Sequence, residues 1–110
     1  MEKGRNKIMN YANQFGYSDV SPCEVVKVIS DKTIEIRYMD TEALPWKREF
    51  HPGGFFGNTS NQGEQKWKIT SNPENPVFRI RLSKNKGWRD AYGNRYKLGD
   101  EPIKFYDFNF

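Results

Sequence analysis

Hydrophobic and polar residues alternate along several short stretches of this chain, a pattern typical of strands with one buried and one solvent-facing side. In residues 33–39, Ile34, Ile36 and Tyr38 alternate with polar neighbours. Residues 77–83 alternate in the same way. Both stretches are therefore predicted strands, each with its hydrophobic side in a core.

A first hairpin is predicted around residues 30–32, whose Ser-Asp-Lys sequence favours a tight turn. The preceding residues 23–29 are apolar on both faces, and we expect them to form a strand at the centre of its sheet. The strand predicted over residues 33–39 follows the turn and completes the hairpin.

Two more hairpins are expected towards the C-terminus. Residues 84–87 close the second. The third consists of residues 87–92 and 95–98, which flank Gly93 and Asn94, a pair of residues common in tight turns. Basic side chains of consecutive strands would then share one face of the sheet.

The remaining elements are shorter. Residues 67–70 are a predicted strand, the aromatic tail over residues 103–110 is expected to add a last one, and residues 5–15 have room for one short helix. The sequence thus predicts a single β-rich domain over residues 1–110. Its expected fold is all-β and mainly antiparallel, a small SH3-like or OB-like barrel or sandwich with at most one short helix.

The polar segment over residues 45–66 is predicted to be a long functional loop. Residues 41–66 show little sign of regular structure, because Pro45 and Pro52 interrupt strand pairing and several glycines follow. Glycines let a ligand approach backbone N–H groups closely. Phe55 within this run is expected either to plug the core or to face a ligand or partner.

Composition favours a small, ring-rich core. Hydrophobic residues make up 35% of the 110 residues and the mean hydropathy is −0.94, but 15% of residues are aromatic. Each buried ring removes about 150 to 250 Å² from water. The single cysteine, Cys23, allows no disulfide within the chain and fits a reducing compartment. With no signal-peptide pattern and no long apolar run, we expect a soluble protein of the cytoplasm that does not enter a membrane.

Positive charge is concentrated in one block. The chain carries a formal net charge of +4, and residues 76–97 hold seven basic residues against the single acid Asp90. Such asymmetry favours an anionic partner.

Catalytic chemistry has no clear candidates. His51 is the only histidine, no nucleophile, phosphate-loop or dinucleotide motif occurs, and the carboxylates are scattered. We therefore predict a protein that is not an enzyme and has no catalytic residue, metal site or cofactor.

Anion and base binding are better supported. Arginines hold phosphates bidentately, a glycine loop adds backbone donors, and rings stack on nucleobases. The predicted ligand-binding residues come from the loop and from the basic block, although Trp88 fits a core position equally well. They are His51, Gly54, Phe55, Asn58, Asn61, Gln65, Arg79, Arg81, Trp88, Arg89 and Arg95.

A set of short motifs occurs in order along the chain: PGGFFG, SNQGEQKW, NPENP, RIRLSKNKGW, YGNRYKLGD and KFYDFNF. In this set the chain resembles a family of small bacteriophage and mobile-element proteins that share a PGGF-G loop and end in an FYD-aromatic-NF tail. The resemblance implies a phage accessory protein that acts against host defence in the host cytoplasm. It assigns no role to individual residues.

Three functions remain open. The leading hypothesis is an oligomeric binding protein that sequesters a nucleotide or cyclic-nucleotide signal of host defence. The second is an anti-CRISPR-like inhibitor that binds a host defence protein through the aromatic loop. The third is a small barrel that binds RNA or DNA.

Overall fold

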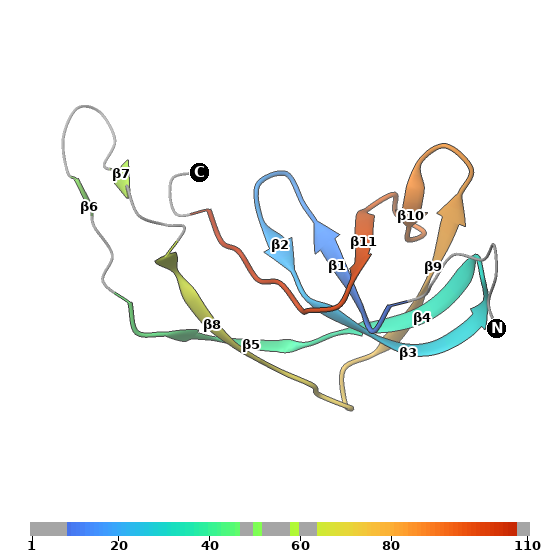
Figure 1. The fold of residues 1–110 in the computed structure, drawn as a ribbon, viewed down its shortest axis with the longest axis horizontal. Helices are drawn as coiled ribbons and strands as arrows, with labels where there is room; N and C mark the ends of the chain where they lie inside the picture. The colour runs from blue at the N-terminus through green and yellow to red at the C-terminus, as the bar shows by residue number, and fades with distance from the viewer. Residues whose placement is uncertain (1–8, 47–49, 52–57, 60–63, 108–110) are drawn as a thin grey trace.

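The computed structural model describes residues 9–46, 50–51, 58–59 and 64–107 of the chain. Six of its strands form a closed barrel, and further strands extend away from the barrel (Figure 1). The barrel strands are β1 (Tyr11–Phe15), β3 (Cys23–Ser30), β4 (Thr33–Tyr38), β9 (Val77–Ser83), β10 (Gly87–Arg89) and β11 (Arg95–Gly99).

Every barrel strand pairs antiparallel with the next barrel strand along the chain, and β11 closes the ring on β1. This is an up-and-down order, in which each strand of the ring has a partner on both sides for at least part of its length. A short strand, β2 (Val20–Ser21), precedes β3 and pairs with β1 along the same edge and in the same register as β3. The predicted small, all-β, antiparallel barrel is confirmed.

An arm extends from the barrel where β4 and β9 continue into a second antiparallel pair. This pair consists of β5 (Asp40–Leu44) and β8 (Lys66–Thr70), and β6 (Phe50–His51) pairs with β7 (Asn58–Thr59) farther out. Figure 1 shows the arm at one side of the barrel, which gives the molecule its extents of 54 × 29 × 27 Å. The prediction of little regular structure over residues 41–66 was wrong for β5. Its polar sequence carries no hydrophobic alternation, and the pairing with β8 supplies its hydrogen bonds.

The inner faces of the barrel strands form the core. The alternation of residues 33–39 and 77–83 is confirmed, because their alternate apolar residues Ile34, Ile36 and Ile80 are fully buried. The buried apolar cluster consists of Ala12, Cys23, Ile34, Ile36, Ile80, Trp88 and Tyr96.

The second half of β3 corrects a prediction. Residues 23–29 were expected to be central and buried, yet Val26, Val28 and Ile29 are exposed. Strand β3 pairs with β1 only between Tyr11 and Glu24, and its register with β4 is interrupted by bulges. Beyond that contact, the edge of β3 that faces β1 has no pairing strand among the described residues.

The described part of the expected N-terminal helix is a strand. Residues 11–15 form β1, whose five residues all pair with β11, so tertiary pairing overrides the weak helical pattern over residues 5–15. Residues 5–8 lie outside the described residues. Among the residues that are described, no helix has the length and apolar character needed to cross a membrane.

The expected C-terminal strand is reduced, within the described residues, to one isolated bridge. Phe105 pairs with Val20, and the two residues exchange backbone hydrogen bonds of 2.9 and 3.0 Å. Asn13 holds the segment before the bridge by donating to Glu101 O and accepting from Ile103 N. Residues 108–110 lie outside the described residues.

Candidate anion-binding face

Three arginines form one cross-strand row on the outside of the barrel. In the antiparallel register, Arg81 of β9 lies opposite Arg89 of β10, and Arg89 lies opposite Arg95 of β11. Residues directly opposite each other share one face of a sheet. Because the adjacent Trp88 and Tyr96 are buried, this face points outward. We call Arg81, Arg89 and Arg95 the arginine row.

No acidic residue lies opposite the ends of the row. Thr33 pairs with Arg81 at one end, and Phe15 pairs with Arg95 at the other. Within the described part of the chain, the side chains of Arg81 and Arg95 make no hydrogen bond or ion pair. Like charges placed directly opposite each other destabilise a sheet. An anion from outside the chain would relieve this repulsion.

Neighbouring contacts position the cations without neutralising the row. Arg79, two residues before Arg81 on β9, donates from Nε to Glu35 Oε2 at 3.0 Å, so its charge is partly balanced. Arg89 instead donates from Nε to Lys86 O and from Nη1 to Gly93 O, both at 2.9 Å. Carbonyl acceptors carry no net charge, so Arg89 is held in place and remains cationic.

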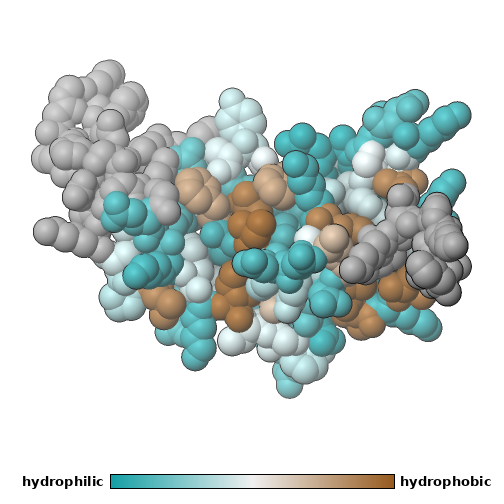
Figure 2. Space-filling view, viewed as in Figure 1, coloured by the Kyte–Doolittle hydropathy of each residue, from teal (hydrophilic) through white to brown (hydrophobic). Residues whose placement is uncertain are grey.

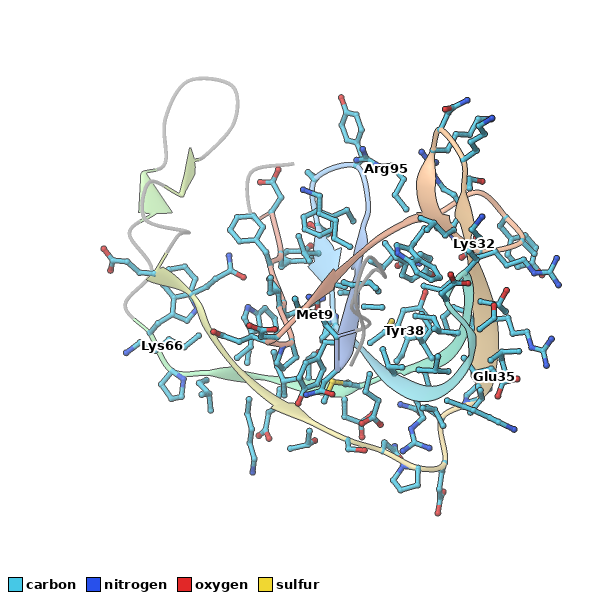
Figure 3. All side chains as sticks on the ribbon, turned by 45° about the vertical axis from the view of Figure 1, so that its right-hand side comes forward. Met9, Lys32, Glu35, Tyr38, Lys66 and Arg95 are labelled. Carbon is cyan, nitrogen blue, oxygen red and sulfur yellow. The ribbon has the colours of Figure 1, made fainter. Side chains whose placement is uncertain are left out.

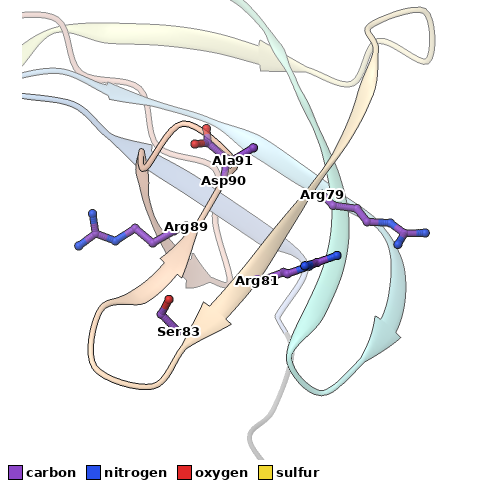
Figure 4. Close-up of a pocket in the computed structure, with 6 residues that line it drawn as sticks. All are labelled: Arg79, Arg81, Ser83, Arg89, Asp90 and Ala91. Carbon is purple, nitrogen blue, oxygen red and sulfur yellow. The ribbon is translucent and has the colours of Figure 1, made fainter.

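A cavity of about 430 Å³ lies over β9 and β10 on this face. Figure 4 shows Arg79 and Arg81 directed to one side and Arg89 directed to the other. The guanidinium groups are therefore spread over the surface instead of converging on one point. Such spacing suits an extended anion better than a single small one. The lining residues are Arg79, Arg81, Ser83, Arg89, Asp90 and Ala91.

A second cavity, of about 310 Å³, lies on the other side of Arg89 and is also lined by Arg95 and Phe15. Lys97 Nζ lies 5.6 Å from the Phe15 ring centroid, which places another cation at the end of the row. Hydrophilic side chains cover the adjoining β9–β10 hairpin (Figure 2). Because Arg89 lines both cavities, the basic surface continues from β9 to β11.

Asp90 is the one acid in the basic block, and its carboxylate is fully engaged in a turn. Oδ1 accepts from the backbone N–H groups of Tyr92 and Asn94, and Oδ2 accepts from Asn94 Nδ2 and Tyr96 OH, at 2.8 to 3.0 Å. Partial burial would raise the pKa of Asp90, but the hydrogen bonds from Asn94, Tyr96 and Tyr92 outweigh it and lower that pKa. Asp90 therefore organises the turn.

The structure brings the predicted residues of the basic block together. Arg79, Arg81 and Arg89 line one cavity, and Trp88, Arg89 and Arg95 line the other. Trp88 is only 9% exposed and belongs to the core cluster, so its main role is packing.

The predicted loop residues lie elsewhere. His51 and Asn58 are opposite each other in the β6–β7 pair, at the far end of the arm from β9 and β10 (Figure 1). Gln65 binds the C-terminal segment, donating from Nε2 to Tyr106 O and accepting at Oε1 from Tyr106 N. Gly54, Phe55 and Asn61 lie outside the described residues. The described residues thus do not join the loop and the arginines in one site.

Sequence reasoning missed three aromatic residues near these cavities. Phe15 ends the segment that has room for a short helix, and only its pairing with Arg95 reveals its place. Tyr38 and Tyr92 line a further cavity beside Asp90. A signal was present for Tyr92, because it lies within the turn formed by Asp90 and Asn94.

Among the described residues, no group of three or more histidine, cysteine, aspartate or glutamate side chains is placed to hold a metal ion. A comparison with known proteins finds no matching family profile, no similar curated protein and no similar solved structure.

Proposed function

We propose that this protein binds single-stranded nucleic acid, with the phosphate backbone lying along the arginine row. The observation that carries the proposal is the register that places Arg81, Arg89 and Arg95 opposite one another without an acidic neighbour in the row. Barrels that bind single strands combine a basic surface that follows the backbone with rings on which bases stack.

The dimensions of the row support an extended ligand. Adjacent strands lie about 4.8 Å apart, so three strands spread the arginines over roughly 10 Å. A chain of consecutive phosphates can meet such a row one after another, each held by an arginine fork. The sequence pI of about 9.2 and the clustering of basic residues on one face also fit a nucleic-acid-binding domain.

A free nucleotide or cyclic nucleotide is the second candidate, because the cavity of about 430 Å³ is large enough for one. The hypothesis as derived from the sequence also uses the loop over residues 45–66. Of its described members, His51 and Asn58 lie at the other end of the molecule (Figure 1) and Gln65 binds the C-terminal segment. We therefore favour the polymer. The anti-defence setting, the homo-oligomer and a host protein as target stay predictions.

Fluorescence anisotropy with labelled DNA and RNA of about 12 nucleotides, within the range bound by one small barrel, tests the proposal. If three phosphates are neutralised, the logarithm of the binding constant should fall with the logarithm of salt concentration with a slope of about −2. Free nucleotides that compete equally well with the oligonucleotides would favour the second candidate.

Two double variants test whether the arginine row itself, and not the net charge of the protein, binds the oligonucleotide. Arg81→Gln combined with Arg95→Gln should reduce the salt slope by about 1.4, because each lost phosphate contact removes about 0.7. Lys66→Gln combined with Lys68→Gln removes the same charge from the arm and should leave the slope nearly unchanged. No binding by the wild type, or equal losses in both double variants, would rule out the arginine row as the site.

A further inference from the structure

A cluster of aromatic residues lies at one end of the barrel, next to the arginine row. Tyr38, Phe78 and Tyr92 line a cavity of about 370 Å³, and we call these three residues the aromatic mouth. Arg79, Asp90 and Ala91 line both this cavity and the cavity beside the arginine row. The aromatic and basic surfaces therefore meet at shared residues.

The rings continue outward from the core. Tyr96 is buried, and its ring centroid lies 6.2 Å from that of Phe78. The centroid of Phe78 lies 5.4 Å from that of Tyr38, whose exposed fraction is 39%. Figure 3 shows Tyr38 within the ring of barrel strands. Packing against buried rings holds Tyr38 in place while leaving part of it open to the cavity.

Tyr92 lies at the edge of the cavity on a fixed turn. The residue is 91% exposed, yet its backbone N–H donates to Asp90 Oδ1 at 2.8 Å. Gly93 follows with a φ of 88°, and its carbonyl accepts from Arg89 Nη1. Because these hydrogen bonds already fix the turn, its backbone loses little conformational entropy when a ligand binds the exposed ring.

We propose that the aromatic mouth holds one nucleobase of the strand whose phosphates lie on the arginine row, an inference that rests on the proposed function. Tyr92 would stack on the base, and Arg79 at the shared boundary would contact the adjoining phosphate or sugar. The Tyr38 hydroxyl accepts from Gln14 Nε2 at 2.8 Å and keeps its own proton for an acceptor on the base edge.

The charges around the mouth favour a base over other ligands of aromatic cavities. Arg79 lines the mouth, and Arg89 is bonded to the turn that carries Tyr92. Methylated lysines and other cationic ligands bind aromatic cages through cation–π contacts, but these arginines would repel them. The Asp90 carboxylate keeps its negative charge, because all of its hydrogen-bond donors are neutral, but Arg79 and Arg89 outnumber it. A nucleobase can stack on the aromatic mouth while its phosphate meets the arginines, so a nucleotide unit matches both parts of the surface.

The experiment compares Tyr92→Leu with Tyr92→Phe in the anisotropy assay. Loss of one stacked base costs about 10-fold in affinity, so the leucine variant should bind about 10-fold more weakly, and phenylalanine should retain binding. Both variants should keep the salt slope of the wild type, because no phosphate contact is removed. Tyr106→Leu, which removes a half-exposed ring beside Gln65, is the control and should bind like the wild type.

A second measurement uses oligonucleotides with one abasic position moved along the strand. Removing the base at one of these positions should weaken wild-type binding by about 10-fold. Tyr92→Leu should bind that abasic oligonucleotide about as well as it binds the intact one. If the wild type binds with the expected salt slope but neither change matters, the mouth is not a base site and the arginine row still stands. If Tyr106→Leu loses as much as Tyr92→Leu, the mouth proposal also fails. If the wild type binds no oligonucleotide, both proposals fail.

Discussion

Arg89 lies directly opposite Arg95 in the antiparallel register of β10 and β11, and no acid separates the two. Cross-strand pairs of this kind change stability by about 0.2 to 1 kcal/mol, with like charges unfavourable. The arrangement therefore costs stability in the free protein. A row kept at such a cost is typical of a functional surface.

Replacing Arg95 by threonine should stabilise the free protein and weaken ligand binding. Threonine favours strands and removes the repulsion from Arg89, so we expect the free energy of unfolding to rise by about 0.5 kcal/mol. Urea denaturation monitored by tryptophan fluorescence measures the change. Lys68→Thr on β8 is the control, because Lys68 lies opposite Glu42, and its loss should not stabilise. A destabilised Arg95→Thr variant would show that the row is not under repulsion.

The Asp90 turn should weaken in acid. Because the folded-state pKa of Asp90 is lowered, its contribution is complete above the ordinary pKa of about 3.9 and is lost as the pH falls through the lowered value. Asp90→Asn removes the acceptor for Asn94 Nδ2 and Tyr96 OH, which should cost about 1 to 2 kcal/mol at neutral pH.

Urea denaturation of the wild type and Asp90→Asn at neutral pH and at about pH 3 tests this expectation, since the difference should shrink in acid. Asp31→Asn, in an exposed turn, is the control and should have little effect. A difference that stays constant between the two pH values would mean that the charge of Asp90 plays no part in the turn.

Strands with hydrophobic alternation could be predicted from the sequence, and strands without it could not. Ile34, Ile36 and Ile80 mark β4 and β9 because each alternates with polar residues. Strand β5 has no such marker, since it lies in a two-stranded arm with mostly exposed side chains. Strand β1 could not be recognised from its own sequence, because its pairing with β11 joins residues 80 to 88 positions apart.

The sequence predicted which basic residues belong to the candidate site, but not how they are arranged in space. The basic block over residues 76–97 identified the cations, and the hairpin turns suggested that they share a face. Whether Arg81, Arg89 and Arg95 fall in one row depends on the register, which one residue of slip would change. The loop over residues 45–66 was joined to this face by chemical analogy alone, and the arm carries its described residues away from the barrel (Figure 1).

Cys23 should be unreactive in the folded protein. Its side chain is fully buried, and burial raises its pKa to about 12, so almost no thiolate forms at neutral pH. An aromatic disulfide reagent should therefore label the native protein only as fast as it unfolds, whereas the denatured chain should react at once. Immediate, complete labelling of the native protein would place Cys23 outside the core.

Asn13 should control the attachment of the C-terminal segment to the barrel. It is 2% exposed, although its register partner Lys97 is exposed, because the C-terminal segment covers it. Its amide donates to Glu101 O at 3.0 Å and accepts from Ile103 N at 2.8 Å. Asn13→Ala would leave both backbone groups without a partner, at a cost of about 1 to 3 kcal/mol if they stay buried.

Amide hydrogen exchange can show how this segment is released. In Asn13→Ala the Ile103 amide should exchange much faster, whereas the Phe105 amide, which donates to Val20 O, should change less because it keeps its acceptor. Asn10→Ala replaces an exposed side chain next to β1 and should leave both amides protected. Equal acceleration at Ile103 and Phe105 would mean that the segment detaches as one unit, and unchanged exchange at Ile103 would mean that Asn13 does not anchor it.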